Sequence, residues 1–223
     1  MENTSKFATN DGFEPARTAI LVKALELAAF DGWTASMFDA AVRSADIPHS
    51  DGVAAFPGRI GDLLRYWSMT TDSAIAEAMM APGFRSGKVR EKVANAVLAR
   101  IGALAPHKEA ARRAAALLAA PHMAGLGVKL TWASADTIWR GLGDKSTDFN
   151  FYSKRAILSG VLASTTARWF ADETEDLRDT QRFLAARIEN VMQIEKIKAQ
   201  GKKLGRDPAA PISWLAKLRY PTS

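Results

Sequence analysis

The chain has 223 residues, is 48% hydrophobic and 24% charged, and carries a net charge of +6, a balance typical of a globular protein with a buried core. It has no cysteine, which excludes disulfides, zinc–thiolate sites, iron–sulfur clusters and a cysteine nucleophile. No apolar run reaches the roughly 18 residues that could span a bilayer, and the acidic opening MENTSKFATNDGFEPAR resembles neither a secretory signal nor a transit peptide.

Helical periodicity runs through almost the whole chain. Apolar residues recur at helical spacing after Pro15, and Asp31-Gly32 ends that run. Pro57-Gly58 and Pro82-Gly83 break the chain further on. No alternating pattern bounded by turns indicates a strand. The sequence predicts an all-α fold, with helices over about residues 15–31, 35–45, 50–56, 60–81, 87–104, 107–120, 123–142, 148–171 and 174–200.

Residues 17–67 resemble the DNA-binding head of TetR-type regulators. The shared features are a helix ending in Gly32-Trp33, a second helix, a turn with Ile47, and a short helix ending in Phe56-Pro57. This resemblance implies a TetR-like helical fold with a helix-turn-helix head. We divide the chain into a divergent head at 1–70, a helical ligand-binding body at 71–200, and a basic linker with an amphipathic helix at 201–223.

The head lacks the chemistry that reads DNA. Its second helix, HSDGVAAF, would lie in the major groove but contains no Lys or Arg. Residues 1–70 hold six Lys and Arg against nine Asp and Glu, a net charge of −3, which repels phosphate. No nucleic-acid partner is expected. A TetR-type transcriptional regulator that responds to a small apolar ligand remains the alternative function.

No catalytic or metal-binding motif is present. His49, His107 and His122 form no HExxH or ExxH pair, and neither a nucleophile elbow nor a phosphate-binding loop occurs. The glycines of Gly125-Leu126-Gly127 are better explained by a turn or close helix packing. The sequence therefore predicts a binding protein rather than an enzyme, with no metal and no catalytic residue.

Residues 107–142 combine many alanines and glycines with scattered large apolar side chains. Small residues among bulky ones permit either tight helix packing or an apolar cavity. If a cavity forms, its candidate lining residues are Leu117, Leu118, Met123, Leu126, Leu130, Trp132 and Trp139.

The last segment joins a basic linker to a short amphipathic stretch. Residues 196–223 hold seven Lys and Arg against one Asp, and the stretch ISWLAKLRY places apolar residues on one helical face beside basic ones. Such a helix either docks on the body or lies in the headgroup region of a membrane. We favour the membrane, with Ile212, Trp214, Leu215, Lys217, Leu218 and Arg219 as the associating residues.

The block GLGDKSTDFNFYSKRAILSGVLASTTARWFADETEDLRDTQRFLAARIENV at 141–191, with APHMAGLG at 120–127 and TIWRGLGD at 137–144, resembles the Coq-nine family, the accessory proteins of ubiquinone biosynthesis. The resemblance implies a dimeric TetR-like fold that binds isoprenoid quinone intermediates or phospholipid and assists the di-iron demethoxyubiquinone hydroxylase (Coq-seven type). Dimers of this fold pair through their last two long helices, here about 148–171 and 174–200. With no transit peptide, we expect a bacterial protein in the cytoplasm, peripheral to the inner membrane.

The resemblance also implies a patch that docks the hydroxylase, made of Ile138, Leu142, Phe151, Tyr152 and Arg155. Phe151 stands where eukaryotic members commonly have Trp, which keeps the apolar area but loses an N–H donor. Helical spacing puts Phe151, Lys154, Arg155 and Leu158 on one face, which we expect to be an exposed basic face. Phe149, Tyr152, Ala156 and Gly160 follow a neighbouring face that we expect to turn toward the core.

Overall fold

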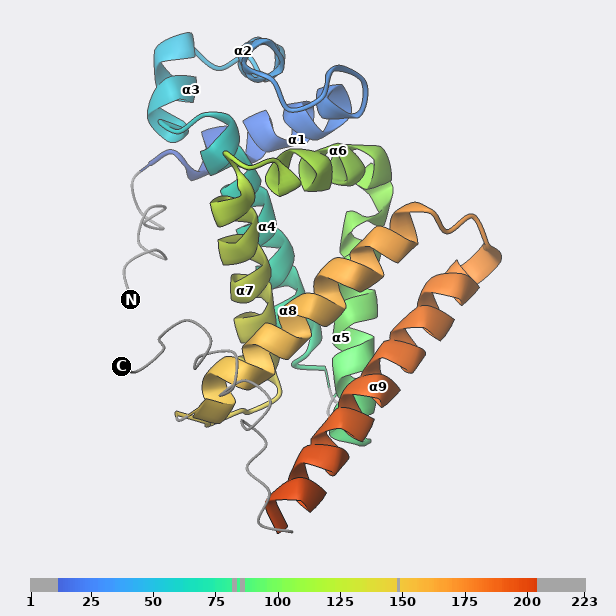
Figure 1. Ribbon diagram of the computed structural model, residues 1–223. Helices are drawn as coiled ribbons and strands as arrows, with labels where there is room; N and C mark the ends of the chain where they lie inside the picture. Colours follow the sequence, from blue (N-terminus) through green and yellow to red (C-terminus); the bar gives the residue numbers. More distant parts are fainter. Residues whose placement is uncertain (1–11, 82–83, 85–86, 148, 204–223) are drawn as a thin grey trace, which may run out of the picture.

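The computed structural model describes residues 12–81, 84, 87–147 and 149–203, and all the regular structure in this part of the chain is helical (Figure 1). The all-α prediction is confirmed, and the predicted helices lie within a few residues of the observed ones. The helices are α1 (Glu14–Asp31), α2 (Ala35–Ser44), α3 (His49–Ala55), α4 (Ile60–Ala78), α5 (Val89–Leu104), α6 (Lys108–Ala119), α7 (Ala124–Gly141), α8 (Phe149–Phe170) and α9 (Arg178–Lys203).

Helices α1 to α3 and the start of α4 form the head around a small aromatic core. The Phe56 ring meets the rings of Phe38 and Tyr66 edge-on, at centroid distances of 6.3 and 5.7 Å. A Cβ added at Gly52 would lie 2.6 Å from a Val42 methyl group. Gly52 therefore lets α3 pack closely on α2, so its presence in the second helix of the motif is explained by packing.

Trp33, the aromatic residue that follows α1, joins the head to the body. Its indole N–H donates to the carbonyl oxygen of Ala110 in α6 at 2.9 Å, and its ring stacks on Trp67 of α4 at 5.5 Å. Helix α6 accordingly crosses directly beneath the head (Figure 1). The boundary between head and body at residue 70 stays a prediction, because the two parts pack against each other around Trp33.

In the body, α7 packs between α4 and α8, and α9 runs along α8 and α5 (Figure 1). A Cβ on Gly127 would lie 2.8 Å from the Leu118 carbonyl oxygen, so this glycine allows α6 and α7 to approach closely, as the sequence suggested. The turn between α8 and α9 is fixed by Asp172, whose carboxylate accepts hydrogen bonds from Thr174 and Thr180. These bonds hold the pKa of Asp172 well below its usual range.

None of the described helices offers a stretch apolar enough to cross a lipid bilayer. The residues predicted to associate with membrane, Ile212, Trp214, Leu215, Lys217, Leu218 and Arg219, lie outside the described part of the chain.

Candidate functional site

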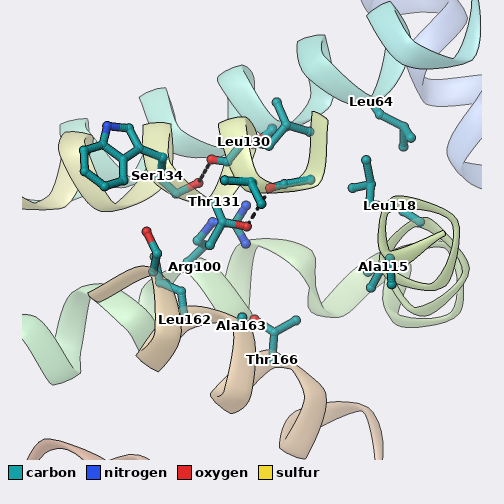
Figure 2. Close-up of a pocket in the computed structure, with 18 of the residues that line it drawn as sticks. Leu64, Arg100, Ala115, Leu118, Leu130, Thr131, Ser134, Leu162, Ala163 and Thr166 are labelled. Carbon is teal, nitrogen blue, oxygen red and sulfur yellow. Dashed lines mark hydrogen bonds between the residues drawn. The ribbon is translucent and has the colours of Figure 1, made fainter. Parts of the chain in front are cut away.

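A cavity of about 800 Å³ lies in the body, enclosed by α4, α5, α6, α7 and α8 (Figure 2). Its volume falls in the range of small-molecule sites in proteins. The wall is mostly apolar. The residues that line it are Leu64, Trp67, Ser68, Thr71, Arg100, Leu104, Ala111, Ala114, Ala115, Leu118, Ala119, Ala124, Gly127, Val128, Leu130, Thr131, Trp132, Ser134, Ala156, Ser159, Leu162, Ala163, Thr166, Ala167 and Phe170.

Three of the seven lining candidates predicted from the sequence, Leu118, Leu130 and Trp132, line this cavity. The other four were placed wrongly. Leu117 and Met123 pack against the hydrophobic core instead. Leu126 is half-buried and turns toward the start of α4 near Gly61.

Trp139 of α7 is the fourth of these residues, and it contacts α8 on the side that faces away from the cavity. It lines a separate hollow of about 410 Å³ between α5, α8 and α9. Its indole N–H donates to the carbonyl oxygen of Lys154 at 3.1 Å, and the Lys154 ammonium lies 5.4 Å from the ring centroid. Trp139 thus holds the end of α7 against the start of α8.

The mouth of the cavity lies at α7, α8 and the end of α6, since the exposed lining residues are found there. Val128, with 69% of its surface exposed, stands on the α7 side. On α8 the rim consists of Ala156, Ala163 and Ala167, which recur at helical spacing, and Ala119 completes it from α6. The rim is therefore apolar and built of small side chains.

The deep wall carries a polar cluster that the sequence analysis missed. Arg100 of α5 donates through Nε to Asp72 of α4 at 3.3 Å, and Ser134 of α7 donates to the other carboxylate oxygen at 2.9 Å. Burial raises the pKa of Asp72 above its ordinary value, against the opposing effect of Arg100 and Ser134. A sequence signal existed: an Asp in the middle of the apolar pattern of α4 needs a buried partner.

Beside the cavity, Arg155 organises the loop between α7 and α8. Its Nε donates to Asp136 at 2.5 Å, and its terminal nitrogen donates to Asp144 and to the Phe151 carbonyl oxygen, both at 3.1 Å. The guanidinium carbon lies 3.5 Å from the centroid of the Phe151 ring. Hydrogen bonds from Lys154, Ser146 and Arg155 hold the pKa of Asp144 well below its usual range.

The two faces predicted for α8 are therefore wrong. Arg155 and Leu158 are buried, with 1% and 2% of their surface exposed, whereas Tyr152 is 62% exposed and Ala156 and Gly160 also face solvent. Arg155 is buried because two carboxylates from the preceding segment neutralise its charge. The side chain of Phe149 lies outside the described part of the structure.

Ile138 is also buried, with 1% of its surface exposed, because it faces the core side of α7. Ile138 and Arg155 thus cannot belong to an exposed patch. Leu142 and Phe151 are half-buried, and Tyr152 is exposed. The Tyr152 ring lies 5.1 Å from Phe151 and 6.4 Å from Trp132, a lining residue of the cavity. We call Phe151, Tyr152 and Trp132 the aromatic surface.

The three histidines lie apart, at the start of α3, in the turn Ala105–His107, and between α6 and α7. Within the described residues, no three His, Asp or Glu side chains gather closely enough to hold a metal ion. In α3, the exposed residues are His49, Ser50, Asp51 and Ala54, and none of them is a Lys or Arg that would contact phosphate.

The helices of this chain are arranged as in the TetR-like class of folds. A TetR transcriptional regulator from Nitrosomonas europaea superposes with a TM-score of 0.64 at 20% sequence identity, covering 79% of this chain and 97% of that chain. This likeness confirms the predicted fold.

Within that class, the sequence is similar to the ubiquinone biosynthesis protein COQ9. Residues 124–195 match the COQ9 family model. Mitochondrial COQ9 of Bos taurus is 29% identical and that of Homo sapiens 28% identical, each over 200 residues and 86% of this chain. The chain spans 62% of the length of these two relatives. The resemblance to the Coq-nine family is thereby confirmed.

Proposed function

We propose that this protein is a non-catalytic accessory protein of ubiquinone biosynthesis. It binds an isoprenoid quinone intermediate or another membrane lipid in its apolar cavity and presents the bound molecule to the demethoxyubiquinone hydroxylase. The observation that carries the proposal is the 800 Å³ apolar cavity whose mouth lies beside the aromatic surface. The similarity to proteins named for ubiquinone biosynthesis gives the class of ligand.

An apolar cavity offsets the main cost of this task. Lifting a hydrocarbon chain out of a membrane into water costs roughly 25 cal/mol per Å² of exposed apolar surface. Side chains such as Leu118, Leu130 and Phe170 cover that surface instead. The small residues at the rim leave room for a long chain to continue out of the mouth.

Mass spectrometry of lipid extracted from the purified protein tests the proposal. The protein expressed in a cell that makes ubiquinone should carry a prenylated ring compound or a phospholipid in near-stoichiometric amount. Protein that carries no lipid, and takes none up from vesicles containing ubiquinone, would refute a lipid-binding role.

We further propose that the protein works at a membrane surface on the cytoplasmic side, held by the segment 212–219. In a vesicle flotation assay with anionic lipid, the variant carrying Trp214→Ser and Leu215→Ser should bind at least tenfold more weakly than the unaltered chain, because Trp and Leu anchor such helices. The matched control is Val22→Ser with Phe30→Ser, two exposed apolar residues of α1. Equal flotation of all three proteins would remove the tail from the proposal.

The aromatic surface is the proposed docking site for the hydroxylase, in place of the predicted patch. Tyr and Trp residues are typical hot spots of protein interfaces, and here the exposed Tyr152 and the half-buried Trp132 border the cavity mouth. A partner bound there would meet a ligand that leaves the cavity.

We also propose that two copies of the chain pair through α8 and α9.

Tyr152→Ser should weaken binding of the hydroxylase at least tenfold, the effect of losing one hot-spot residue. The fold should stay intact, because the side chain is 62% exposed. Surface plasmon resonance against the purified enzyme measures the change. Phe30→Ser, which removes an aromatic residue 82% exposed on α1, is the control and should bind normally. Unchanged affinity of the Tyr152 variant would place the docking site elsewhere.

A further inference from the structure

One fully buried hydroxyl group in the cavity wall has no partner. The Oγ atom of Ser68 in α4 is buried and makes no hydrogen bond to any described residue. Four other hydroxyls of the wall, those of Thr71, Thr131, Ser134 and Ser159, donate within the protein; Thr131 donates to Gly127 at 2.9 Å, and Ser159 donates to Arg155 at 2.8 Å. A buried hydroxyl without a partner costs free energy. If the Ser68 side chain rotates so that its hydroxyl faces the cavity that the residue lines, a bound ligand would remove that cost.

Ser68 lies close to the polar cluster of the deep wall. Ser68 and Asp72 are four residues apart in α4 and therefore occupy the same helix face on successive turns. Asp72 accepts a hydrogen bond from the Nε atom of Arg100. Both Ser68 and Arg100 line the cavity. The Arg100 side chain reaches in among the lining residues (Figure 2). Its two terminal nitrogens make no hydrogen bond to a residue in the described part of the chain.

The charge of this cluster is already balanced. Arg100 is the one ionisable residue among the described lining residues, and its charge is matched by Asp72, 3.3 Å away. An anionic ligand would leave a net negative charge in an apolar site, which is unfavourable. A neutral oxygen atom, as in a carbonyl or phenol group, would accept hydrogen bonds from Arg100 and Ser68 without adding charge.

We propose that Ser68 and Arg100 bind the uncharged, oxygen-bearing end of the ligand, a quinone or phenol ring whose hydrocarbon chain extends toward the alanine rim. This inference rests on the proposed lipid-binding function and gives the ligand an orientation. The ring lies deep, between α4, α5 and α7, and the chain leaves between α7 and α8.

Displacement of the neutral dye N-phenyl-1-naphthylamine from the full-length protein tests this assignment with three probes that share a ten-carbon chain. These are 2-decyl-1,4-benzoquinone, decylbenzene and decanoate. The unaltered protein should bind the quinone at least tenfold more tightly than either of the others. Ser68→Ala should weaken quinone binding about three- to tenfold, the effect of one hydrogen bond, and leave decylbenzene binding unchanged.

The matched control is Ser164→Ala, the same substitution on α8 at a hydroxyl outside the cavity that already donates to the Gly160 carbonyl oxygen at 2.7 Å; it should not change quinone affinity. The thermal midpoint of Ser68→Ala should equal or exceed that of the unaltered protein, because the lost hydroxyl has no partner. The double variant Asp72→Asn with Arg100→Gln, which removes both charges together, should lose at least tenfold in quinone affinity.

The possible outcomes separate the two proposals. If Ser68→Ala binds the quinone normally, or loses affinity equally for the quinone and decylbenzene, the polar anchor is refuted while the apolar cavity stands. If decanoate binds more tightly than the quinone, the ligand end is anionic and the assignment fails. If no probe displaces the dye from the unaltered protein, the lipid-binding function itself fails.

Discussion

Replacing Arg155 by Met should lower the free energy of unfolding by about 3 kcal/mol, the lower end of the range for breaking a buried ion pair. The substitution keeps the unbranched apolar stem but removes the guanidinium group. It leaves Asp144, whose side chain is 6% exposed, and Asp136 without their shared partner. We expect the lower end because Asp136 is 20% exposed and retains Arg140. Urea denaturation at pH 7 measures the change.

Arg140→Met is the control for this prediction. Arg140 pairs with the same Asp136, at 2.7 Å, but its side chain is 71% exposed, so its loss should cost no more than about 1 kcal/mol. If the Arg155 and Arg140 variants lose equal stability, the buried cluster does not hold the loop between α7 and α8.

The pH dependence gives a second test of the Arg155 cluster. The folded pKa of Asp144 is lowered, so the stability that this shift contributes is present above the unfolded pKa of about 3.9 and is lost as the pH falls toward the folded pKa. Because the variant removes part of the shift, its stability deficit should shrink between pH 7 and pH 3. A deficit that stays constant would show that Asp144 is not the group concerned.

Filling the cavity should abolish ligand binding. In the variant carrying Ala115→Phe and Ala163→Phe, two aromatic rings occupy the space between α6 and α8 (Figure 2). We expect at least a tenfold loss in affinity for decyl-benzoquinone and an equal drop in the lipid that is extracted from the purified protein. Stability should change little or rise, because cavity-filling substitutions often add about 0.5–2 kcal/mol.

The matched control is Ala116→Phe, on the same helix at a neighbouring position that is exposed and does not line the cavity. It should bind the quinone normally. If the filled variant also binds normally, the ligand lies somewhere other than this cavity, and the hollow beside Trp139 becomes the next candidate.

The helices could be predicted because their signals are local. Apolar spacing, the breaks at Pro57-Gly58 and Pro82-Gly83, and the positive φ of Gly143 after α7 all act within a few residues. The face that each helix buries is not local in this way. Arg155 is polar by composition but buried by carboxylates 11 and 19 residues earlier in the chain.

For the same reason, the sequence predicts only part of the cavity lining. The lining residues of α6 and α7 lie in the alanine-rich segment 107–142, where the candidate lining residues are predicted. Ser68 and Arg100 come from helices distant in sequence. One local signal could have extended the prediction: Ala156, Ala163 and Ala167 recur on one face of α8, where large apolar residues would be expected if that face packed against the core.

The alanine rim also bears on exchange kinetics. Alanine has no side-chain rotamers to rearrange, so Ala156, Ala163 and Ala167 leave the mouth ungated on the α8 side. The lifetime of a complex then depends mainly on how much hydrocarbon the cavity covers. At about 0.8 kcal/mol per methylene group, each added CH₂ within the cavity lengthens the residence time roughly fourfold. A carrier of this kind would release short-chain molecules quickly and retain long-chain ones until a partner or a membrane receives them.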